Sequence, residues 1–360
     1  MKRVGNILKN LIPQKWTTKL WEQLVARSVT HVFGPKRIPC SRNTAIVTCV
    51  VRNGEFYIES FIRHYQRMGF RHIVLLDNGS SDDTVTLARE FQNVSVWRST
   101  LPIEAHQRLF KRYLAKRFGQ GGWCLDADID EFFEFPGSDE IELTQLLDYL
   151  NRNRYTAVVT QLADMFSARP LSELEALGAG TLQEEYPYYD ISNVKHEPYA
   201  QAELTGKVGG KNVVGNEATD LLWGGIRRTL WGNHCLLTKH SLFFQDRDME
   251  LFSHVHFHNN ARLADVSCAM LHYKLAGDIS AVAEQNRIGF SGNGKGYRDC
   301  IEFIRSNPNY QVKQATAKRL SRVSELVESG FLFASSSYGK YVKELSAANA
   351  APCATAGSGR

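Results

Sequence analysis

Strand-like and helix-like segments alternate between residues 44 and 128, and this alternation constrains the fold more than any other feature. The strand-like segments are "TAIVTCVV" (44–51), "RHIVLLD" (71–77), "VSVWRS" (94–99) and "GGWCLDAD" (121–128). The helix-like segments are 55–70, with apolar residues at near-helical spacing, 84–92, capped by Ser81 or Asp82, and the basic stretch 103–118. A β-α-β-α-β-α-β order predicts an α/β fold whose mostly parallel sheet carries helices on both faces.

Polar and acidic segments follow three of these strands. They are "VRNGE" after the first strand, "DNGSSDD" after the second and "DADIDE" after the fourth. The carboxyl ends of parallel strands meet at one edge of a sheet, and such folds bind their ligands at that edge. We therefore expect the three segments to lie together in a ligand site.

The most acidic stretch, "WCLDADIDEFFEFP" (123–136), has three alternative interpretations: a metal site on a nucleotide, a calcium loop and an acidic surface turn. A calcium loop of the EF-hand type starting at Asp126 needs Gly at its sixth position and an acid at its twelfth, where this chain has Glu131 and Gly137. A surface turn requires neither the apolar residues before it nor the two phenylalanines after it. Carboxylates two positions apart at a buried strand end favour magnesium or manganese, with positions left open for substrate phosphates.

The chain after residue 136 is less regular. Residues 155–166 are typical of a further strand, 224–244 of a β-rich region, and 278 onward of two or three helices, whereas 167–222 predicts a long irregular segment shaped around a site. From this pattern we expect four parts. They are a basic N-terminal arm (1–43), a main domain (44–275), a helical C-terminal extension (276–349) and a flexible tail (350–360).

Composition and targeting signals narrow the class of protein. The 360 residues are 43% hydrophobic and 22% charged, which is typical of an ordinary globular protein rather than a fibrous or disordered one. The seven cysteines are odd in number and form no CxxC pair, which favours reduced thiols over a disulfide framework. The basic start, 1–29, has no signal-peptide core and no run of about 20 apolar residues that a membrane span requires. We therefore expect a cytoplasmic protein.

The N-terminal arm is strongly basic. Residues 1–42 contain nine Lys or Arg and a single acid, Glu22, and four large apolar residues are interleaved with them: Trp16, Leu20, Trp21 and Leu24. One interpretation is contact with an anionic membrane, as a peripheral protein at the inner face of the plasma membrane; the other is a pair of surface helices packed on the domain. No nucleic-acid-binding motif accompanies the basic residues, so we expect no nucleic-acid partner.

Several motifs in a fixed order point to a known family. "VVRNGEFYIESFIRHYQRMGFRHIVLLDNGSSDDT" and "WCLDADIDEFFEFP" are followed by "LADMF", "YYD", "GGIRR", "LTKHSL" and "LHYKL". Over roughly residues 44 to 290 this series resembles the bacterial family 2-type glycosyltransferases with a D-x-D-E-F motif. The resemblance implies a GT-A fold, a nucleotide-diphosphate sugar donor, a glycan or lipid-linked acceptor, and Mn²⁺ or Mg²⁺ as cofactor. One departure is that the family commonly reads "RNE" after the first strand, where this chain reads "RNGE" and places Glu55 one position later.

The resemblance also assigns roles to individual residues. Asp128 and Asp130 match the D-x-D motif and are expected on the metal side, while Asp126 is an additional acid. His272 in "LHYK" is the candidate for a further metal ligand and Lys274 for a diphosphate contact, with a buried structural pair as the alternative. The candidate nucleotide-sugar contacts are Arg52, Asn53, Asp77, Asn78, Arg227 and Arg228. For "DNGSSDD" the alternative is a helix-capping turn, and for "RR" it is a solvated surface pair.

The resemblance further implies direct displacement with inversion, which needs a general base on the acceptor hydroxyl. Asp164 in "LADMF" and Asp190 in "YYD" are the candidates, with Glu217 and Asp220 behind them, and the sequence does not select among the four.

Other site types and function classes stay open. "SHVHFHNN" places His254, His256 and His258 on one face if the stretch is a strand, which favours a polar wall of the site over a zinc centre. A nucleotidyltransferase would use a similar fold and metal. A non-catalytic nucleotide- or carbohydrate-binding protein would not need the D-x-D carboxylates.

Overall fold

The computed structural model describes residues 14–175, 182–279 and 294–350. The helices are α2 (Gln14–Ser28), α3 (Glu55–Arg67), α4 (Thr84–Ala88), α5 (Ile103–Phe118), α6 (Leu143–Arg152), α7 (Leu182–Glu185), α8 (Glu203–Val208), α9 (Ile226–Trp231), α11 (Gly294–Ser306), α12 (Ser324–Glu328) and α13 (Ser336–Ala350). A 3-10 turn spans Leu171–Glu173. Residues 1–13 of the predicted arm and 351–360 of the predicted tail lie outside the described residues.

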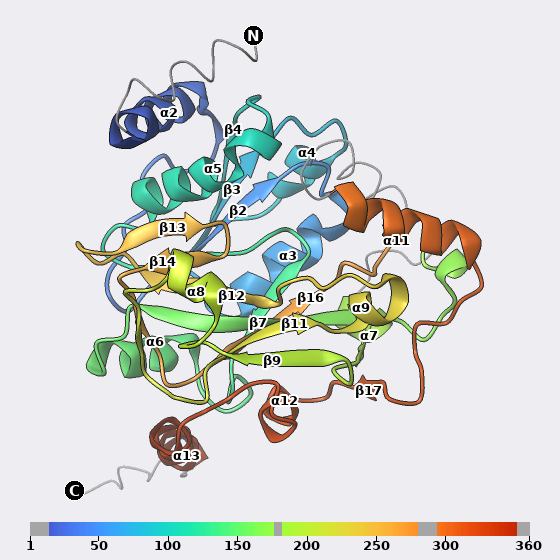
Figure 1. Ribbon diagram of the computed structural model, residues 1–360. Coiled ribbons are helices and arrows are strands. Elements are labelled where there is room, and N and C mark those ends of the chain that lie inside the picture. The colour runs from blue at the N-terminus through green and yellow to red at the C-terminus, as the bar shows by residue number, and fades with distance from the viewer. Residues whose placement is uncertain (1–13, 176–181, 280–293, 351–360) are drawn as a thin grey trace, which may run out of the picture.

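The main sheet has the strand order β1-β4-β3-β2-β5-β12-β7-β15-β10 (Figure 1). Its strands are β1 (Thr30–Phe33), β2 (Ala45–Val51), β3 (His72–Asp77), β4 (Val94–Arg98), β5 (Trp123–Asp126), β7 (Ala157–Phe166), β10 (Val213–Val214), β12 (Thr238–Phe244) and β15 (Arg262–Leu263). Joined to it are β6 (Glu131–Glu134), β8 (Tyr188–Tyr189), β16 (Cys268–His272) and β17 (Lys318–Arg319). Two small sheets pair β9 (Val194–Pro198) with β11 (Asp220–Gly224) and β13 (Glu250–His254) with β14 (Phe257–Asn259).

The directions of the strands confirm the predicted α/β fold with a mostly parallel sheet. β4, β3, β2 and β5 are neighbours in this order and run parallel. β12 runs antiparallel between β5 and β7, and β16 lies parallel to β7 and antiparallel to β6. The four strand-like segments of 44–128 are therefore β2 to β5, and the three helix-like segments are α3 to α5.

Helices cover both faces of this sheet, so β2 is buried along its whole length. Ala45, Val47, Cys49 and Val51 of β2 pack in one core with side chains of α3, whereas Ile46 and Val50 pack in a second core with side chains of α5. Successive residues of a strand point to opposite faces. The continuous apolar run of β2, without polar alternation, is what a strand covered on both faces requires.

The prediction of a β-rich region over 224–244 is wrong in its first half. Residues Ile226–Trp231 form α9, and strand β12 begins only at Thr238. Gly225, with φ 66°, precedes the helix, and Gly232, with φ 70°, ends it in the left-handed conformation. Glycine adopts positive φ without the steric cost of a Cβ, so two glycines can bracket a helix that is too short to show apolar periodicity.

The three histidines of "SHVHFHNN" do not share one strand face. His254 ends β13, His258 lies in β14, and His256 lies in the turn between these two antiparallel strands. The conditional prediction of one continuous strand is wrong because the chain reverses direction within the motif.

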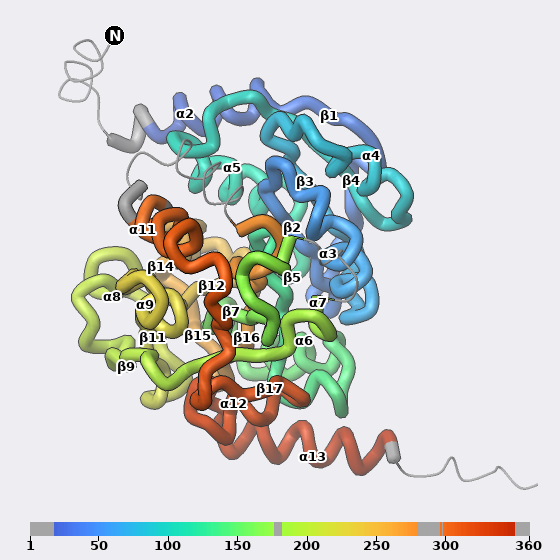
Figure 2. The backbone as a smooth tube through the Cα atoms, turned by 90° about the vertical axis from the view of Figure 1, so that its right-hand side faces the viewer, coloured from blue at the N-terminus to red at the C-terminus, as the bar shows by residue number. Residues whose placement is uncertain are grey.

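The described C-terminal residues, 294–350, share a core with the main sheet. The core on the α3 side includes Leu326, Phe331, Leu332, Tyr338 and Val342. The hydroxyl of Tyr338 donates a hydrogen bond to the Pro136 carbonyl (2.8 Å), and β17 extends the sheet at β8. Within residues 294–350 the chain forms α11, α12 and α13, as the sequence predicts, and Figures 1 and 2 place α13 at the end of the molecule away from α2.

The six cysteines of the described residues are unpaired, and Cys353 lies outside those residues. Cys49, Cys124 and Cys268 are buried, and burial raises the pKa of each of these thiols. Because the thiolate is the reactive form, these three cysteines serve in packing.

Buried neutral histidines predict that the fold loses stability at mildly acid pH. Burial lowers the pKa of His64 to about 4 and that of His240 to about 3. The stability that the fold gains from keeping these histidines neutral is complete above the pKa of histidine in the unfolded chain. It is lost as the pH falls below that pKa, because the unfolded chain then binds protons that the folded chain excludes. Between pH 7 and pH 5 the free energy of unfolding should fall by about 2 kcal/mol per such histidine.

Urea unfolding at the two pH values measures this loss. The His64→Gln variant keeps a group that can donate to the Phe133 carbonyl but cannot bind the proton, so its free energy of unfolding should fall less than that of the wild type. An equal fall in both proteins would contradict the assignment of His64 as a buried neutral histidine.

Candidate active site

The polar segments predicted for a ligand site meet at the carboxyl edge of the sheet. β3, β2 and β5 are adjacent and parallel, so Asp77 and Asp126, which end β3 and β5, lie at the same edge. β7 and β16 run in the same direction, and His272 pairs with Asp164 near their carboxyl ends. Segment 127–130 leads from β5 into β6, which pairs with β16. The fold thus brings all three predicted segments and "LHYK" together.

The loops after β2 and β3 are tied to each other by hydrogen bonds. The Asn53 backbone N–H donates to Ser80 Oγ (2.9 Å), and Asn53 Oδ1 accepts from the Ser81 N–H (2.9 Å). The Glu55 N–H donates to Asp82 Oδ2 (3.0 Å), and the Glu55 carboxylate accepts from the Asp83 N–H (3.2 Å). The two loops therefore form one unit, and the side chains of Asn53 and Glu55 hold it together.

Asp77 and Asn78 are buried at the base of this loop unit. Asp77 accepts from Arg98 Nε (2.6 Å) and from the Ser80 N–H (3.0 Å), and the Asn78 amide donates to the carbonyls of Ser99 and Leu101. Arg52, by contrast, is exposed. "DNGSSDD" does form a turn before a helix, as the structural alternative predicted: Asp82 Oδ1 accepts from the N–H of Thr84, the first residue of α4.

Two buried lysines neutralise the acidic segment after β5. Lys111, from α5, lies 2.7 Å from Asp126 Oδ2 and 3.0 Å from Asp128 Oδ1. Lys239, from β12, lies 3.1 Å from the other oxygen of Asp128 and also pairs with Glu131. Glu131 Oε2 in turn accepts from the Asp128 backbone N–H (3.0 Å). We call these five residues the lysine-carboxylate cluster.

The cluster separates the pKa values of its carboxyl groups. Burial raises the pKa of Asp126 to about 6, against the opposing effect of Lys111. Burial would also raise the pKa of Asp128, but Lys111 and Lys239 outweigh it and hold this pKa well below the usual value. Burial disfavours the charged lysines, yet the carboxylates raise the pKa of both. Asp128 is therefore a fixed anion between two fixed cations.

A second cluster joins Asp130, His272, Asp164 and Arg227. His272 Nε2 lies 3.3 Å from Asp130 Oδ2, and His272 Nδ1 lies 2.5 Å from Asp164 Oδ1. The other oxygen of Asp164 accepts from Arg227 Nε (2.8 Å). Burial would raise the pKa of Asp130, but His272 and Lys274 lower it to about 2. Burial would lower the pKa of His272, but Asp130 and Asp164 outweigh it and raise this pKa above the usual value.

Asp130 and His272 have the chemistry expected of ligands for a divalent cation. A metal-binding histidine usually gives its second ring N–H to a carboxylate, and Asp164 occupies that position on His272. Magnesium is often held by one or two protein carboxylates together with substrate phosphates. Within the described residues, no three His, Cys, Asp or Glu side chains form a metal-binding group. Of the three predicted metal-side residues, Asp130 and His272 lie together and Asp128 lies with the lysines.

The remaining predicted residues fall at different distances from these clusters. Lys274 is close enough to Asp130 to lower its pKa. The Arg228 side chain is partly exposed and runs along Gly224. Asp190 accepts from the Ser192 N–H (2.8 Å) and Thr316 Oγ1 (2.6 Å), and it lines a small cavity together with Asp164. Among the residues behind them, Asp220 pairs with His196 (3.0 Å) and Glu217 is exposed.

Two of the three histidines of "SHVHFHNN" feel the charges of the lysine-carboxylate cluster, His256 through both lysines and His258 through Lys111. Burial, followed by the charges of Lys239 and Lys111, lowers the pKa of His256 well below the usual value. The ring of His258 instead packs against Phe243 (4.2 Å) and Phe252 (4.6 Å). His258 therefore belongs to the core, and a polar wall that includes His254 and His256 stays a prediction.

Sequence reasoning assigned no role to Lys111, Lys239 or Arg98. Lys111 directly follows Leu109 and Phe110 in α5, and this position next to an apolar pair was the one local signal in the sequence; the structure shows that Lys111 is buried. Lys239 stands in the quoted motif "LTKHSL", which could have drawn attention to it.

Comparisons with known proteins give only distant likenesses. No protein-family model matches the chain, and no curated protein matches it in sequence. Among solved structures, Staphylococcus aureus TarS aligns with 72% of this chain and 43% of its own length, at 11% identity and a TM-score of 0.33. A structure of TarS residues 1–349 aligns with 39% of this chain and 48% of its own length, at 14% identity and a TM-score of 0.28. Glucosyl-3-phosphoglycerate synthase from Mycobacterium tuberculosis, bound to Mn²⁺, UDP and glucosyl-3-phosphoglycerate, aligns with 37% of this chain and 47% of its own length. The identity is 19% and the TM-score is 0.21. The chain thus spans about half the length of these proteins or less.

Removal of Lys239 should destabilise the fold strongly. In Lys239→Met, Glu131 and Asp128 lose a counter-charge that they share in a buried setting, which typically costs about 3–5 kcal/mol. Urea unfolding at neutral pH measures the loss. The double variant Lys239→Met/Glu131→Gln removes one charge of each sign and should recover part of it.

The exposed Lys340→Met variant is the matched control and should stay within about 0.5 kcal/mol of the wild type. A double variant that is no more stable than Lys239→Met alone would contradict the ion pairing of Lys239 with Glu131.

Proposed function

We propose that this chain is a glycosyltransferase that moves a sugar from a nucleotide-diphosphate donor to a glycan or lipid-linked acceptor. One observation carries the proposal: Asp130 and His272, far apart in sequence, converge at the carboxyl edge of the sheet with Asp164 behind them. The order of motifs along residues 44 to 290, which resembles family 2-type glycosyltransferases with a GT-A fold, supports the same function.

We assign the nucleotide to the loop unit after β2 and β3. Asp77 lies at its base, Arg52 is exposed at its rim, and Asn53 and Asn78 fix its shape. A carboxylate can accept from a base or ribose, and a guanidinium can meet a phosphate. Because Asp77 is already bonded to Arg98, the nucleotide would meet an oriented carboxylate.

We assign the diphosphate to the region of Asp130 and His272. These two residues would hold Mn²⁺ or Mg²⁺, which when bound supplies positive charge to the oxygens of the leaving diphosphate. Asp164 orients His272 through Nδ1 and is itself fixed by Arg227. Arg227, Arg228 and Lys274 are the further cations proposed to stabilise the charge that develops on the leaving group.

Asp128 has a positioning role in this proposal. Its two oxygens are bound by Lys111 and Lys239, which fixes the backbone of the turn that carries Asp130. We propose that Asp128 supports the metal site indirectly, by fixing this turn, and that Asp130 contacts the ion.

For the acceptor we propose inversion with Asp190 as the general base. Asp164 is the weaker candidate because Arg227 and His272 occupy both its oxygens and lower its pKa against the effect of burial. Asp190 shares a cavity with Asp164, and its hydrogen-bond donors among the described residues are uncharged: the Ser192 N–H and the Thr316 hydroxyl. On this geometry we assign to Asp190 the role of accepting the proton of the sugar hydroxyl.

The test of the function is a screen of nucleotide sugars for donor hydrolysis and transfer with Mn²⁺ or Mg²⁺. The wild type should consume one donor class, and Asp130→Asn and His272→Gln should each lower turnover by about 100-fold or more. Asp148→Asn, a half-buried residue of α6 that pairs with Arg152 and belongs to neither cluster, is the control and should retain activity. Near-normal turnover of a folded Asp130→Asn protein would refute the metal assignment, and pyrophosphate release from a nucleoside triphosphate would indicate a nucleotidyltransferase instead.

We also propose that α2 docks on an anionic membrane surface, where a lipid-linked acceptor would be found. α2 faces the domain through the buried Val25 and through Glu22, which pairs with Arg112 and Lys116 of α5. Three of the four exposed large hydrophobic side chains in the described residues lie on α2: Leu20, Trp21 and Leu24, of which Trp21 also contacts the His106 ring of α5 (5.6 Å between centroids). No helix within the described ranges combines the length and apolarity of a membrane span. Apolar side chains set among lysines and arginines suit the boundary of anionic lipids.

Vesicle co-sedimentation of the full chain tests the docking. The wild type should pellet with phosphatidylcholine vesicles that contain phosphatidylserine, and salt should release it because the attraction is partly electrostatic. The triple variant Leu20→Gln/Trp21→Gln/Leu24→Gln should stay in the supernatant. Val213→Gln, which removes the fourth exposed hydrophobic side chain elsewhere on the surface, should bind like the wild type. Equal binding of the triple variant would leave α2 as a helix packed on the domain.

A further inference from the structure

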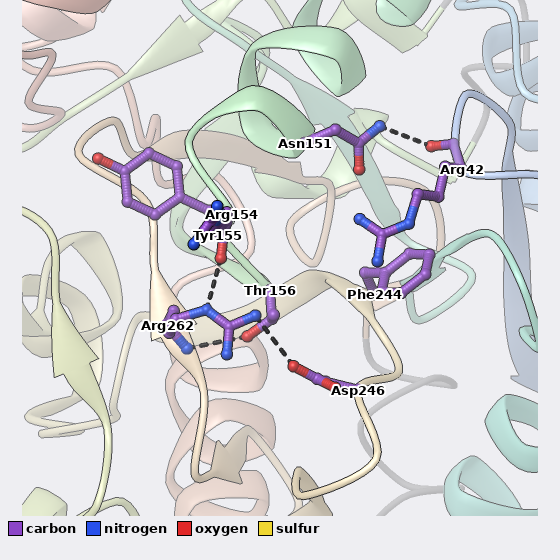
Figure 3. Close-up of a pocket in the computed structure, with 8 residues that line it drawn as sticks. All are labelled: Arg42, Asn151, Arg154, Tyr155, Thr156, Phe244, Asp246 and Arg262. Carbon is purple, nitrogen blue, oxygen red and sulfur yellow. Dashed lines mark hydrogen bonds and ion pairs between the residues drawn. The ribbon is translucent and has the colours of Figure 1, made fainter.

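A second cavity lies at the opposite edge of the sheet from the candidate active site. It has a volume of about 290 Å³ and is lined by Arg42, Asn151, Arg154, Tyr155, Thr156, Phe244, Asp246 and Arg262 (Figure 3). Phe244, the last residue of β12, pairs with Trp123, the first residue of β5. The cavity therefore lies where β5 begins, whereas Asp126 lies where it ends. We call it the arginine cavity.

The lining of the cavity carries an excess of positive charge, and on one side hydrogen bonds hold Arg262 in place. It contains three guanidinium groups and one carboxylate, and arginine stays protonated at any physiological pH. The Arg262 guanidinium donates to Asp246 Oδ2 (2.9 Å) and to the Arg154 carbonyl (2.6 Å). The Arg262 backbone N–H donates to Thr156 Oγ1 (2.8 Å), which belongs to a residue that is only 2% exposed. Arg262 is therefore fixed before any ligand arrives.

Arg42 is held on the opposite side of the cavity. Its guanidinium lies over the Phe244 ring, 4.7 Å from the centroid, as Figure 3 shows. Its backbone carbonyl accepts from the Asn151 amide (2.9 Å), and Asn151 is itself fixed by a hydrogen bond from the buried Trp123 indole (3.2 Å). Stacking on an aromatic face leaves the edge of a guanidinium free to donate in its own plane.

Arg154 occupies a strained position. It follows α6 and its cap residue, Asn153, and has φ 59°, in the left-handed region where glycine is preferred after a helix. A non-glycine residue in this conformation costs roughly 1 kcal/mol. Glycine would relieve the strain, so an arginine at this position is most simply explained by a use for its side chain.

We propose that the arginine cavity binds a small anion through a phosphate group. An excess of two positive charges in the lining matches the charge of a phosphate monoester, and arginines bind phosphate oxygens in paired hydrogen bonds. The volume exceeds that of a bare phosphate, and Tyr155 and Phe244 add apolar surface for the rest of the ligand. The inference does not depend on the glycosyltransferase proposal, because no residue of the cavity belongs to the candidate active site.

Isothermal titration calorimetry at constant ionic strength tests the site, with inorganic phosphate and glucose 6-phosphate as probes and acetate as a monoanion. Both phosphates should bind the wild type, and acetate should not. Arg154→Gly removes one cation while relieving the strained φ, so it should fold normally and weaken phosphate binding by about 10-fold or more. Arg42→Gln should weaken it similarly. Tighter binding of glucose 6-phosphate would identify a phosphorylated metabolite, and equal binding would identify free phosphate as the ligand.

The matched control is Arg152→Gln, which removes a cation from the same helix end. Arg152 pairs with Asp148 (2.8 Å) and does not line the cavity, so this variant should bind phosphate like the wild type. The proposal is overturned if phosphate gives no binding heat with the wild type, if Arg154→Gly binds as tightly as the wild type, or if Arg152→Gln loses as much affinity as Arg154→Gly. The last result would reduce the effect to overall charge.

Discussion

The arrangement of the candidate active site depends on the pairing of three carboxyl groups with two buried lysines. Asp126, Asp128 and Glu131 follow a buried strand, and a buried carboxylate without a counter-charge is strongly unfavourable. Lys111 comes from a helix on one face of the sheet and Lys239 from an antiparallel strand, so the ion pairs join the turn after β5 both to the preceding helix and to a strand 111 positions away. The same turn carries Asp130 to His272, because β6 pairs with β16 at Glu131 and His272 and the Asp130 carbonyl accepts from the Tyr273 N–H (2.8 Å).

Much of this organisation could be predicted from the sequence, and the exceptions have physical causes. β2 to β5 and α3 to α5 follow from apolar periodicity, and their order places "VRNGE", "DNGSSDD" and "DADIDE" at one edge. α9 could not be found this way because its two bounding glycines, rather than its periodicity, define it. Lys239 and Asp128 are 111 positions apart, and a contact over that separation leaves no local pattern. Asp164 and His272 were each singled out from the sequence, but only the parallel pairing of β7 with β16 reveals that they act on each other.

The two sites with functional proposals lie at the two ends of the same strands and differ in their charge. At the carboxyl edge, lysines and carboxylates compensate one another, and the residues that remain for a ligand are few and fixed. At the amino edge, the arginine cavity keeps an excess of cations close to solvent. The first arrangement suits a site where charge develops during a reaction, since fixed dipoles and ions need no reorganisation. The second suits reversible capture of an anion. One sheet can therefore support both without a shared residue.

Strand β12 carries Lys239 near one end and Phe244 at the other, and it is paired on both sides, with β5 and with β7. In such a strand an insertion or deletion of one residue turns every following side chain to the opposite face of the sheet. A change of length between Lys239 and Phe244 would therefore withdraw either the lysine from its carboxylates or the aromatic ring from Arg42. In evolutionary terms, the length of this seven-residue strand should be among the least variable features of related chains.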